Sequence, residues 1–241
     1  MRFADVMYNG FFGGTMEKPQ PLQTVVWFMI ICAVIGYLLG SINWGVILSR
    51  KYGDDVRNHG SGNAGATNMM RTYGKKAGAK TLGLDFLKAT VASFAARLLL
   101  GVMGAYIAGL FCIIGHAYPI FFKFKGGKGV VTIATMCLWT EWKTFLVLLA
   151  IYAIVIFGYK MVSMASCLVA ALYSLILYMF IGPHIGVIIA LISGVLVIYL
   201  HRANIRRIFD HTESKLNFHR KSSGNQDMEE SNEVTESNEE K

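Results

Sequence analysis

The feature that most constrains the fold is a series of long apolar segments without charge. Residues 22–49 contain no Asp, Glu, Lys or Arg, and neither do residues 161–200. A helix needs about 20 apolar residues to cross a bilayer, so the first segment suffices for one span and the second for two. Only 16% of the chain is charged, against about 25% in an ordinary soluble domain. The sequence therefore predicts an all-α integral membrane protein.

Lys and Arg gather in three segments that alternate with the apolar ones, at 50–80, 123–128 and 201–220. Because cytoplasmic loops collect these residues, we assign all three segments to the cytoplasmic side. This assignment predicts about seven transmembrane helices, with the N-terminus outside and the C-terminus in the cytoplasm. The expected spans are 22–49, 81–100, 101–122, 129–140, 144–159 and two within 161–200. Segment 81–100 carries charges and segment 129–140 is short, so the sequence leaves open whether these two cross fully.

The expected domain organisation is a loose leader at 1–21, a membrane domain at 22–216 and an acidic tail at 217–241. The tail has low hydrophobicity and charge of one sign, a composition typical of disorder. The net charge of the chain is +8, although residues 222–241 carry seven acids and one base. The membrane domain is therefore strongly basic, which suits anionic lipid head groups or phosphorylated substrates. Nucleic acid is not an expected partner, because the bases lie between apolar spans.

The first polar motif runs from residue 60 to residue 71 and reads GSGNAGATNMMR. Its glycines allow backbone N–H groups to converge on an anion, and the guanidinium of Arg71 can grip a phosphate in two places. The candidate residues are Ser61 and Arg71, with Gly60, Gly62, Asn63 and Asn68. From these residues alone, a flexible basic loop beside the membrane is an equally good interpretation.

The second motif, KFKGGKG at 123–129, combines three glycines with three lysines directly before an apolar segment. It does not contain the G-x-x-x-x-G-K-[ST] string of nucleoside-triphosphate-binding loops. The candidate phosphate-binding residues are Lys125, Gly126, Gly127, Lys128 and Gly129. A simple basic turn is the alternative interpretation.

Several polar residues lie in or beside the apolar segments. Asp85 and Lys88 are three residues apart and share a helix face, so they could form a structural ion pair or contact a substrate. His116 comes just before the second motif and is either structural or part of the site. Ser163 and Ser166 begin a later span, where hydroxyl groups more often serve helix packing than chemistry.

The third motif is HRANIRR at 201–207, which continues to Glu213. His201 and Asn204 share a helix face, on the same predicted side of the membrane as the two glycine-rich motifs. The chain contains no H-x-x-x-x-D string, no G-x-S-x-G elbow and no H-E-x-x-H zinc motif. Its four cysteines all fall within apolar runs, which favours buried packing positions over a metal site or a disulfide framework. We therefore expect neither a metal nor a cofactor.

Taken together, the three motifs resemble those of the PlsY family, the bacterial acyl-phosphate:glycerol-3-phosphate acyltransferases. The resemblance covers about residues 36–216 and keeps the motifs in the family's order. It implies seven transmembrane helices in the bacterial inner (cytoplasmic) membrane and an active site that faces the cytoplasm. It also implies that Ser61 and Arg71 are needed for activity and that the glycines of the second motif help to bind glycerol 3-phosphate. By the same resemblance, Lys128, Ser166, His201 and Asn204 line the polar site, and Glu213 holds the third motif together.

The resemblance thus implies transfer of a fatty acyl group from acyl phosphate to the 1-hydroxyl of glycerol 3-phosphate. An acyl phosphate is already activated, so positioning and charge stabilisation can suffice without a protein nucleophile. The expected catalytic residues are Ser61, Arg71, Lys128, His201 and Asn204, with either His201 or a substrate phosphate oxygen as the proton acceptor. Expected partners are the two substrates, the lipid bilayer and a soluble enzyme that makes acyl phosphate. The competing interpretation is a transporter of a small organic phosphate, although the chain shows no inverted repeat.

Overall fold

The computed structural model describes residues 9–12 and 20–216, and all regular structure within them is helical. The expected disordered tail lies outside the described residues, as does most of the expected leader. The helices are α2 (Leu22–Ser41), α3 (Trp44–Arg50), α4 (Ala66–Ala117), α5 (Val130–Thr140), α6 (Trp142–Tyr159), α7 (Val162–Ile181), α8 (Ile185–Leu200) and α9 (Arg202–Phe209), with short 3-10 turns η1 (Val56–Asn58) and η2 (Ile120–Phe122).

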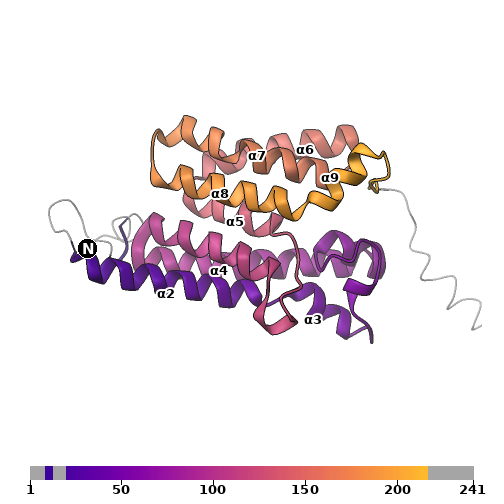
Figure 1. Cartoon of the computed structure of the whole chain (residues 1–241), viewed down its shortest axis with the longest axis horizontal. Helices are drawn as coiled ribbons and strands as arrows, with labels where there is room; N and C mark the ends of the chain where they lie inside the picture. Colours follow the sequence, from indigo (N-terminus) through magenta and orange to yellow (C-terminus); the bar gives the residue numbers. More distant parts are fainter. Residues whose placement is uncertain (1–8, 13–19, 217–241) are drawn as a thin grey trace, which may run out of the picture.

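The helices form two layers that run along the long axis of the molecule (Figure 1). α2 and α4 make one layer, α6, α7 and α8 make the other, and α5 lies between them. The connections that carry the three polar motifs all lie near the end marked by α3 and α9. The fold therefore brings together segments that are far apart in the sequence.

The long helix α4 is not straight, because its chain reverses at Leu100 and Gly101. Both residues have non-helical backbone angles, and Gly101 has φ 59°. The atoms Lys88 Nζ and His116 Nδ1 lie 2.9 Å apart, whereas 28 residues of straight helix would separate them by about 42 Å. The expected division of 81–122 into a hairpin is thus confirmed, with the break at the expected position.

Small residues allow α2 to pack closely on the second leg of this hairpin. A Cβ atom at Gly36 would lie 2.3 Å from the carbonyl oxygen of Ala108, and one at Gly40 would lie 2.4 Å from that of Cys112. The two glycines are one helical turn apart and face the same partner. Such small-residue contacts are typical of helices that associate inside a membrane.

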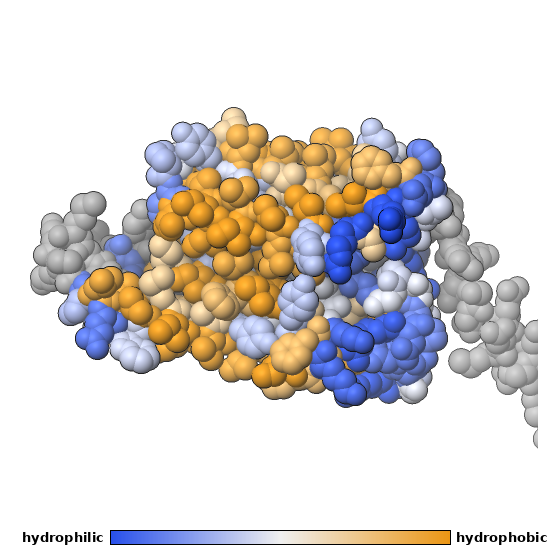
Figure 2. Space-filling view, viewed as in Figure 1, coloured by the Kyte–Doolittle hydropathy of each residue, from blue (hydrophilic) through white to orange (hydrophobic). Residues whose placement is uncertain are grey.

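Large apolar side chains cover the middle of the molecule, and hydrophilic residues gather at the end near α3 and α9 (Figure 2). Phe157 and Met179, for example, are 73% and 75% exposed. A continuous apolar surface of this extent indicates contact with lipid rather than water. Two charged residues of the α4 hairpin, Asp85 and Lys88, are instead buried inside the protein.

Among the described residues, four helical stretches are long and apolar enough to cross a membrane, or five if the bent pair α8 and α9 forms one span. One of the four, Ala66–Phe122, contains the reversal at Gly101 and so supplies two antiparallel legs. The expected total of seven then depends on α5, which has only 11 residues. That total, and the orientation of the termini, stay predictions.

Candidate active site

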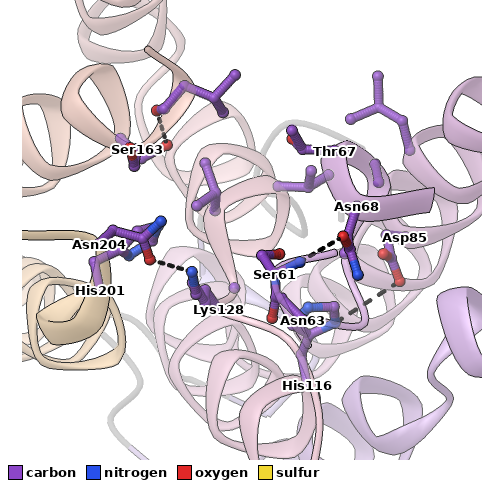
Figure 3. A pocket seen from close by; sticks show the side chains of 18 of the residues that line it. Ser61, Asn63, Thr67, Asn68, Asp85, His116, Lys128, Ser163, His201 and Asn204 are labelled. Atoms are coloured by element: carbon purple, nitrogen blue, oxygen red, sulfur yellow. Dashed lines mark hydrogen bonds and ion pairs between the residues drawn. The ribbon is translucent and has the colours of Figure 1, made fainter. Parts of the chain in front are cut away.

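A cavity of about 130 Å³ lies where the three polar motifs meet. Residues of the first motif, the start of α5, the start of α7 and the junction of α8 with α9 all line it (Figure 3). The three motifs thus meet in space, and Lys128 of the second motif donates a hydrogen bond to Asn204 of the third. The membrane face on which they lie stays a prediction.

The first motif is shaped by the side chain of Asn68. Its Oδ1 accepts a hydrogen bond from the backbone N–H of Ser61 at 3.0 Å, and its Nδ2 donates to the carbonyls of Val56 and His59 at 3.0 and 2.9 Å. Gly60 has φ +55°, and a Cβ atom there would lie 2.3 Å from Asn68 Oδ1. Asn68 thus holds the loop in a turn that presents Ser61 to the cavity.

Two helices begin at the cavity without a side-chain cap. α4 starts after Gly65 and α5 starts after Gly129, and the first residues of both helices line the cavity. Gly129 has φ +73°, a conformation that a residue with a side chain rarely adopts. The unpaired N–H groups of a first turn, together with the helix dipole, favour an anion at such a point. Two helix N-termini therefore add to the positive potential of Lys128.

The third motif is organised around the carboxylate of Glu213. Its Oε1 accepts hydrogen bonds from Ser163 at 2.6 Å and from Asn204 Nδ2 at 2.7 Å, and its Oε2 accepts one from Arg207 Nε at 2.7 Å. Burial alone would raise the pKa of Glu213, but these hydrogen bonds outweigh burial and hold the pKa below its ordinary value. Glu213 therefore stays ionised and connects α7 with α9.

Lys128 is the cation at the centre of the cavity. Burial, reinforced by repulsion from Arg207, lowers the pKa of Lys128 to about 8. The negative charge of an anionic ligand in the cavity would offset this effect of burial and keep the ammonium charged. The opposite wall also contributes a cation, since Arg71 lines the cavity and donates from Nη2 to the carbonyl of Ser214 at 3.2 Å.

His201 presents a hydrogen-bond acceptor. Its Nδ1 lies 2.8 Å from the carbonyl oxygen of Val197, which can only accept, so Nδ1 carries the ring proton. In the neutral ring the lone pair is then on Nε2. Because His201 lines the cavity, this lone pair is available to a substrate hydroxyl.

Comparison with known proteins places this arrangement in one family. The family model described as glycerol-3-phosphate acyltransferase matches residues 30–211. The chain belongs to the glycerol-3-phosphate acyltransferase family.

Individual relatives agree with this assignment. The glycerol-3-phosphate acyltransferase of Finegoldia magna is 38% identical over 193 residues, which cover 78% of this chain and 96% of the relative. That of Bacillus subtilis is 40% identical over 184 residues, which cover 76% and 95%.

Two solved structures of PlsY, an integral membrane glycerol 3-phosphate acyltransferase, have the same fold. Its glycerol 3-phosphate form superposes with a TM-score of 0.74 at 34% identity, covering 78% of this chain and 96% of PlsY. Its lysophosphatidic acid form gives a TM-score of 0.71 at 33% identity, covering 78% and 95%. This protein is thus an acyltransferase, as the motifs predicted, and a multi-pass integral membrane protein, as the apolar segments predicted.

The candidate residues of this acyltransferase fall into two groups. Those that line the cavity are Ser61, Asn63, Asn68, Arg71, Lys128, Gly129, Ser166, His201, Asn204 and Glu213. Those that lie outside its lining are Gly60, Gly62, Lys125, Gly126 and Gly127. The roles proposed for both groups stay predictions.

The backbone N–H groups of Gly126 and Gly127 already have partners. They donate to the carbonyls of Ala117 and His116 at 3.0 and 2.9 Å. These two glycines are therefore needed for close packing of the loop on the end of α4, where a Cβ atom at Gly126 would lie 2.0 Å from the carbonyl oxygen of His116. The N–H groups with no partner inside their helix are those of the first turn of α5.

Sequence reasoning missed the function of Arg57 in the acyltransferase. Its guanidinium is held by Asp55, and its Nη1 donates to the carbonyls of Phe122 and Lys125 at 3.1 and 2.9 Å. Arg57 thus clamps the loop of the second motif to the turn before the first motif. The D-x-R string just upstream of the glycines could have drawn attention to Arg57. Nothing near it in the sequence indicates that Arg57 contacts the loop of the second motif.

Three buried polar residues, Asp85, His116 and Ser163, also line the cavity. The sequence left open whether the first two are structural, and it favoured packing for Ser163. The structure gives Ser163 a defined partner in Glu213. Within the described residues, no group of three or more His, Cys, Asp or Glu side chains is placed to hold a metal ion.

Proposed function

We propose that this acyltransferase moves a fatty acyl group from an acyl phosphate to the 1-hydroxyl of glycerol 3-phosphate. The observation that carries the proposal is the convergence of Lys128, Arg71 and two uncapped helix N-termini on one small cavity. Such a cavity suits substrates that carry phosphate groups. PlsY, its structural neighbour, was solved in a glycerol 3-phosphate form and a lysophosphatidic acid form, which supports the same acceptor.

The transfer proceeds by direct attack. The 1-hydroxyl oxygen of glycerol 3-phosphate forms a bond to the acyl carbonyl carbon, and the carbon–oxygen bond to phosphate then breaks. The hydroxyl proton passes to the departing phosphate or to Nε2 of His201, so the products are lysophosphatidic acid and inorganic phosphate. None of the four cysteines, all within residues 20–216, lines the cavity, which favours a route without an acyl-enzyme.

The protein groups act by position and charge. Lys128 and Arg71 neutralise phosphate, and the N–H groups at the start of α5 stabilise negative oxygen. Each such donor contributes roughly 2.7–4 kcal/mol by deletion in other acyl-transfer enzymes. Holding both substrates in register contributes about 7–11 kcal/mol more.

The proposed setting is the bacterial inner membrane, with the cavity open to the cytoplasm. The cavity lies at the junction of α8 with α9, the end of the molecule where hydrophilic residues gather (Figure 2), and Lys and Arg collect on the cytoplasmic side. A membrane-impermeant thiol reagent tests this orientation. A cysteine introduced at exposed Lys123 should react only after the membrane is opened, in vesicles that keep the cellular orientation.

The enzymatic test uses purified protein, palmitoyl phosphate and glycerol 3-phosphate. Wild type should release phosphate, Lys128→Ala should abolish release, and Lys123→Ala, in the same loop but outside the cavity, should retain it. Absence of release from wild type would refute the proposed donor. Activity with acyl-CoA alone would support glycerol 3-phosphate as the acceptor but refute acyl phosphate as the donor. Flux of glycerol 3-phosphate into liposomes without turnover would favour a transporter.

A further inference from the structure

The buried ammonium group of Lys88 is surrounded by four acceptors inside the α2–α4 layer. Its Nζ lies 3.0 Å from the carbonyl oxygen of Gly40 and 2.6 Å from that of Ile42. It also lies 2.9 Å from Asp85 Oδ1 and 2.9 Å from His116 Nδ1. Lys88 is only 4% exposed, so water does not compete for these positions.

The hydrogens of Lys88 determine the state of the histidine. An ammonium group has three hydrogens and no lone pair. The two carbonyls take two of them and His116 Nδ1 takes the third, while Asp85 Oδ1, 3.8 Å from that nitrogen, pairs with the ammonium by charge without a hydrogen bond. Nδ1 of His116 must therefore accept, because a proton there would face the ammonium hydrogens. A neutral ring with Nδ1 unprotonated carries its hydrogen on Nε2.

His116 lines the cavity, and its Nε2 atom lies against Gly127 of the second motif. A Cβ atom at Gly127 would lie 2.1 Å from it, and His116 lines the cavity although it is only 5% exposed. In the view of Figure 3, His116 and His201 lie on different sides of Lys128. In the part of the chain that the structure describes, no hydrogen bond engages this Nε2.

We propose that His116 is a further substrate-contacting residue, whose Nε2–H donates to an oxygen of a bound phosphate or acyl group. The proposal rests on the proposed function, since it assigns a contact within the same reaction. The two cavity histidines then have opposite tasks, because His201 offers a lone pair and His116 offers a hydrogen. Asp85 and Lys88 are positioning residues that act through His116.

The first test reads the histidine directly. Wild-type protein with ¹⁵N-labelled histidine, in nanodiscs, should show His116 with Nε2 protonated and Nδ1 unprotonated. The signal is assigned by its absence in His116→Gln. Glycerol 3-phosphate, inorganic phosphate and a non-hydrolysable acyl phosphonate are then added separately, and the ligand that shifts the Nε2 signal identifies the source of the oxygen. Protonation on Nδ1, or no shift with any of the three at saturation, would overturn the proposal.

The second test compares a donor with a non-donor at the same position. His116→Leu removes the N–H, whereas His116→Gln keeps an amide N–H near the place of Nε2. His116→Leu should lower kcat/KM by about 10- to 100-fold, the range expected for one hydrogen bond to a charged oxygen, and His116→Gln should recover most of it. The matched control is His184→Gln, because His184 caps α8 at the helix end away from the cavity.

The kinetics of His116→Leu show which substrate His116 contacts. Together with the ¹⁵N titration, they also distinguish failure of this contact from failure of the proposed function. A rise in KM for only one substrate assigns the contact to it, and a fall in kcat alone assigns it to the transition state. His116→Leu with wild-type kcat/KM would contradict the contact. If His116→Leu does not fold, the ¹⁵N titration of wild type decides. If wild type lacks activity with acyl phosphate, the proposed donor fails, while a shift of Nε2 by inorganic phosphate still supports the contact.

Discussion

The side chain of Asn204 donates from Nδ2 to Glu213 Oε1 over 2.7 Å, which fixes the end of the amide that faces the cavity. The Oδ1 end is left to accept from Lys128. Without the carboxylate, the two ends of the amide could exchange, and an NH₂ group would then face the ammonium. Glu213 therefore acts on the cavity through the orientation of Asn204.

Replacement of Glu213 by alanine should affect stability and catalysis together. The change removes the acceptor for Ser163, Asn204 and Arg207, and the loss of one partner from a buried network costs about 3 kcal/mol. We expect a lower Tm by tryptophan fluorescence in detergent and a lower kcat/KM. Glu213→Gln keeps one acceptor oxygen and should lose less of both. Wild-type Tm in Glu213→Ala would contradict this role.

The pH dependence should report the ionisation of Lys128. As pH rises through about 8, the free enzyme loses the positive charge of Lys128, so kcat/KM for glycerol 3-phosphate should fall. On the acid side, kcat/KM should fall below about pH 6, where a phosphate monoester loses its second negative charge. Initial rates between pH 5 and 10 measure both limbs.

The matched variant for this profile is Lys128→Arg, because guanidinium stays charged throughout that range. In this variant, the pH at which kcat/KM falls on the alkaline side should rise by more than one unit, even if the overall rate is lower. If kcat/KM of Lys128→Arg falls at the same pH as that of wild type, the ionisation of another group causes the fall.

Alanine at Gly126 should disturb the loop through packing, not through loss of a phosphate contact. Its Cβ would lie 2.0 Å from the carbonyl oxygen of His116, a backbone atom that cannot move alone. We expect a loss of about 1–3 kcal/mol in stability, with reduced activity. The control is Gly83→Ala, since a Cβ atom at this helical glycine meets nothing within 4 Å. Equal effects of the two changes on Tm would refute the packing explanation.

Loss of the Arg57 clamp should weaken acceptor binding. Arg57→Lys cannot hold Asp55 and the carbonyls of Phe122 and Lys125 at once, because its ammonium lacks the planar fork. The loop of the second motif should then sample other positions, and KM for glycerol 3-phosphate should rise about 10-fold. Steady-state kinetics measure this rise. Lys80→Ala removes an exposed charge outside the cavity and should leave KM unchanged.

Much of the candidate site could be predicted because its residues stand in compact motifs. Ser61, Lys128 and His201 were recognised from sequence and all line the cavity. The placement of Gly126 and Gly127 could not be predicted. Glycine-rich loops have similar sequences whether their N–H groups face a ligand or another segment of the protein. Only the end of α4, folded against the loop, decides this.

The sequence by itself determined the helical membrane architecture, the hairpin in 81–122 and the clustering of basic motifs at one end. These properties follow from hydropathy and charge along each segment, which act locally and against the bilayer. The tertiary structure decided which polar groups pair across the chain, such as Lys88 with His116 and Arg57 with Lys125. Such pairs depend on how the helices pack and where the chain reverses. No local sequence pattern indicates them, because their members are far apart in the sequence.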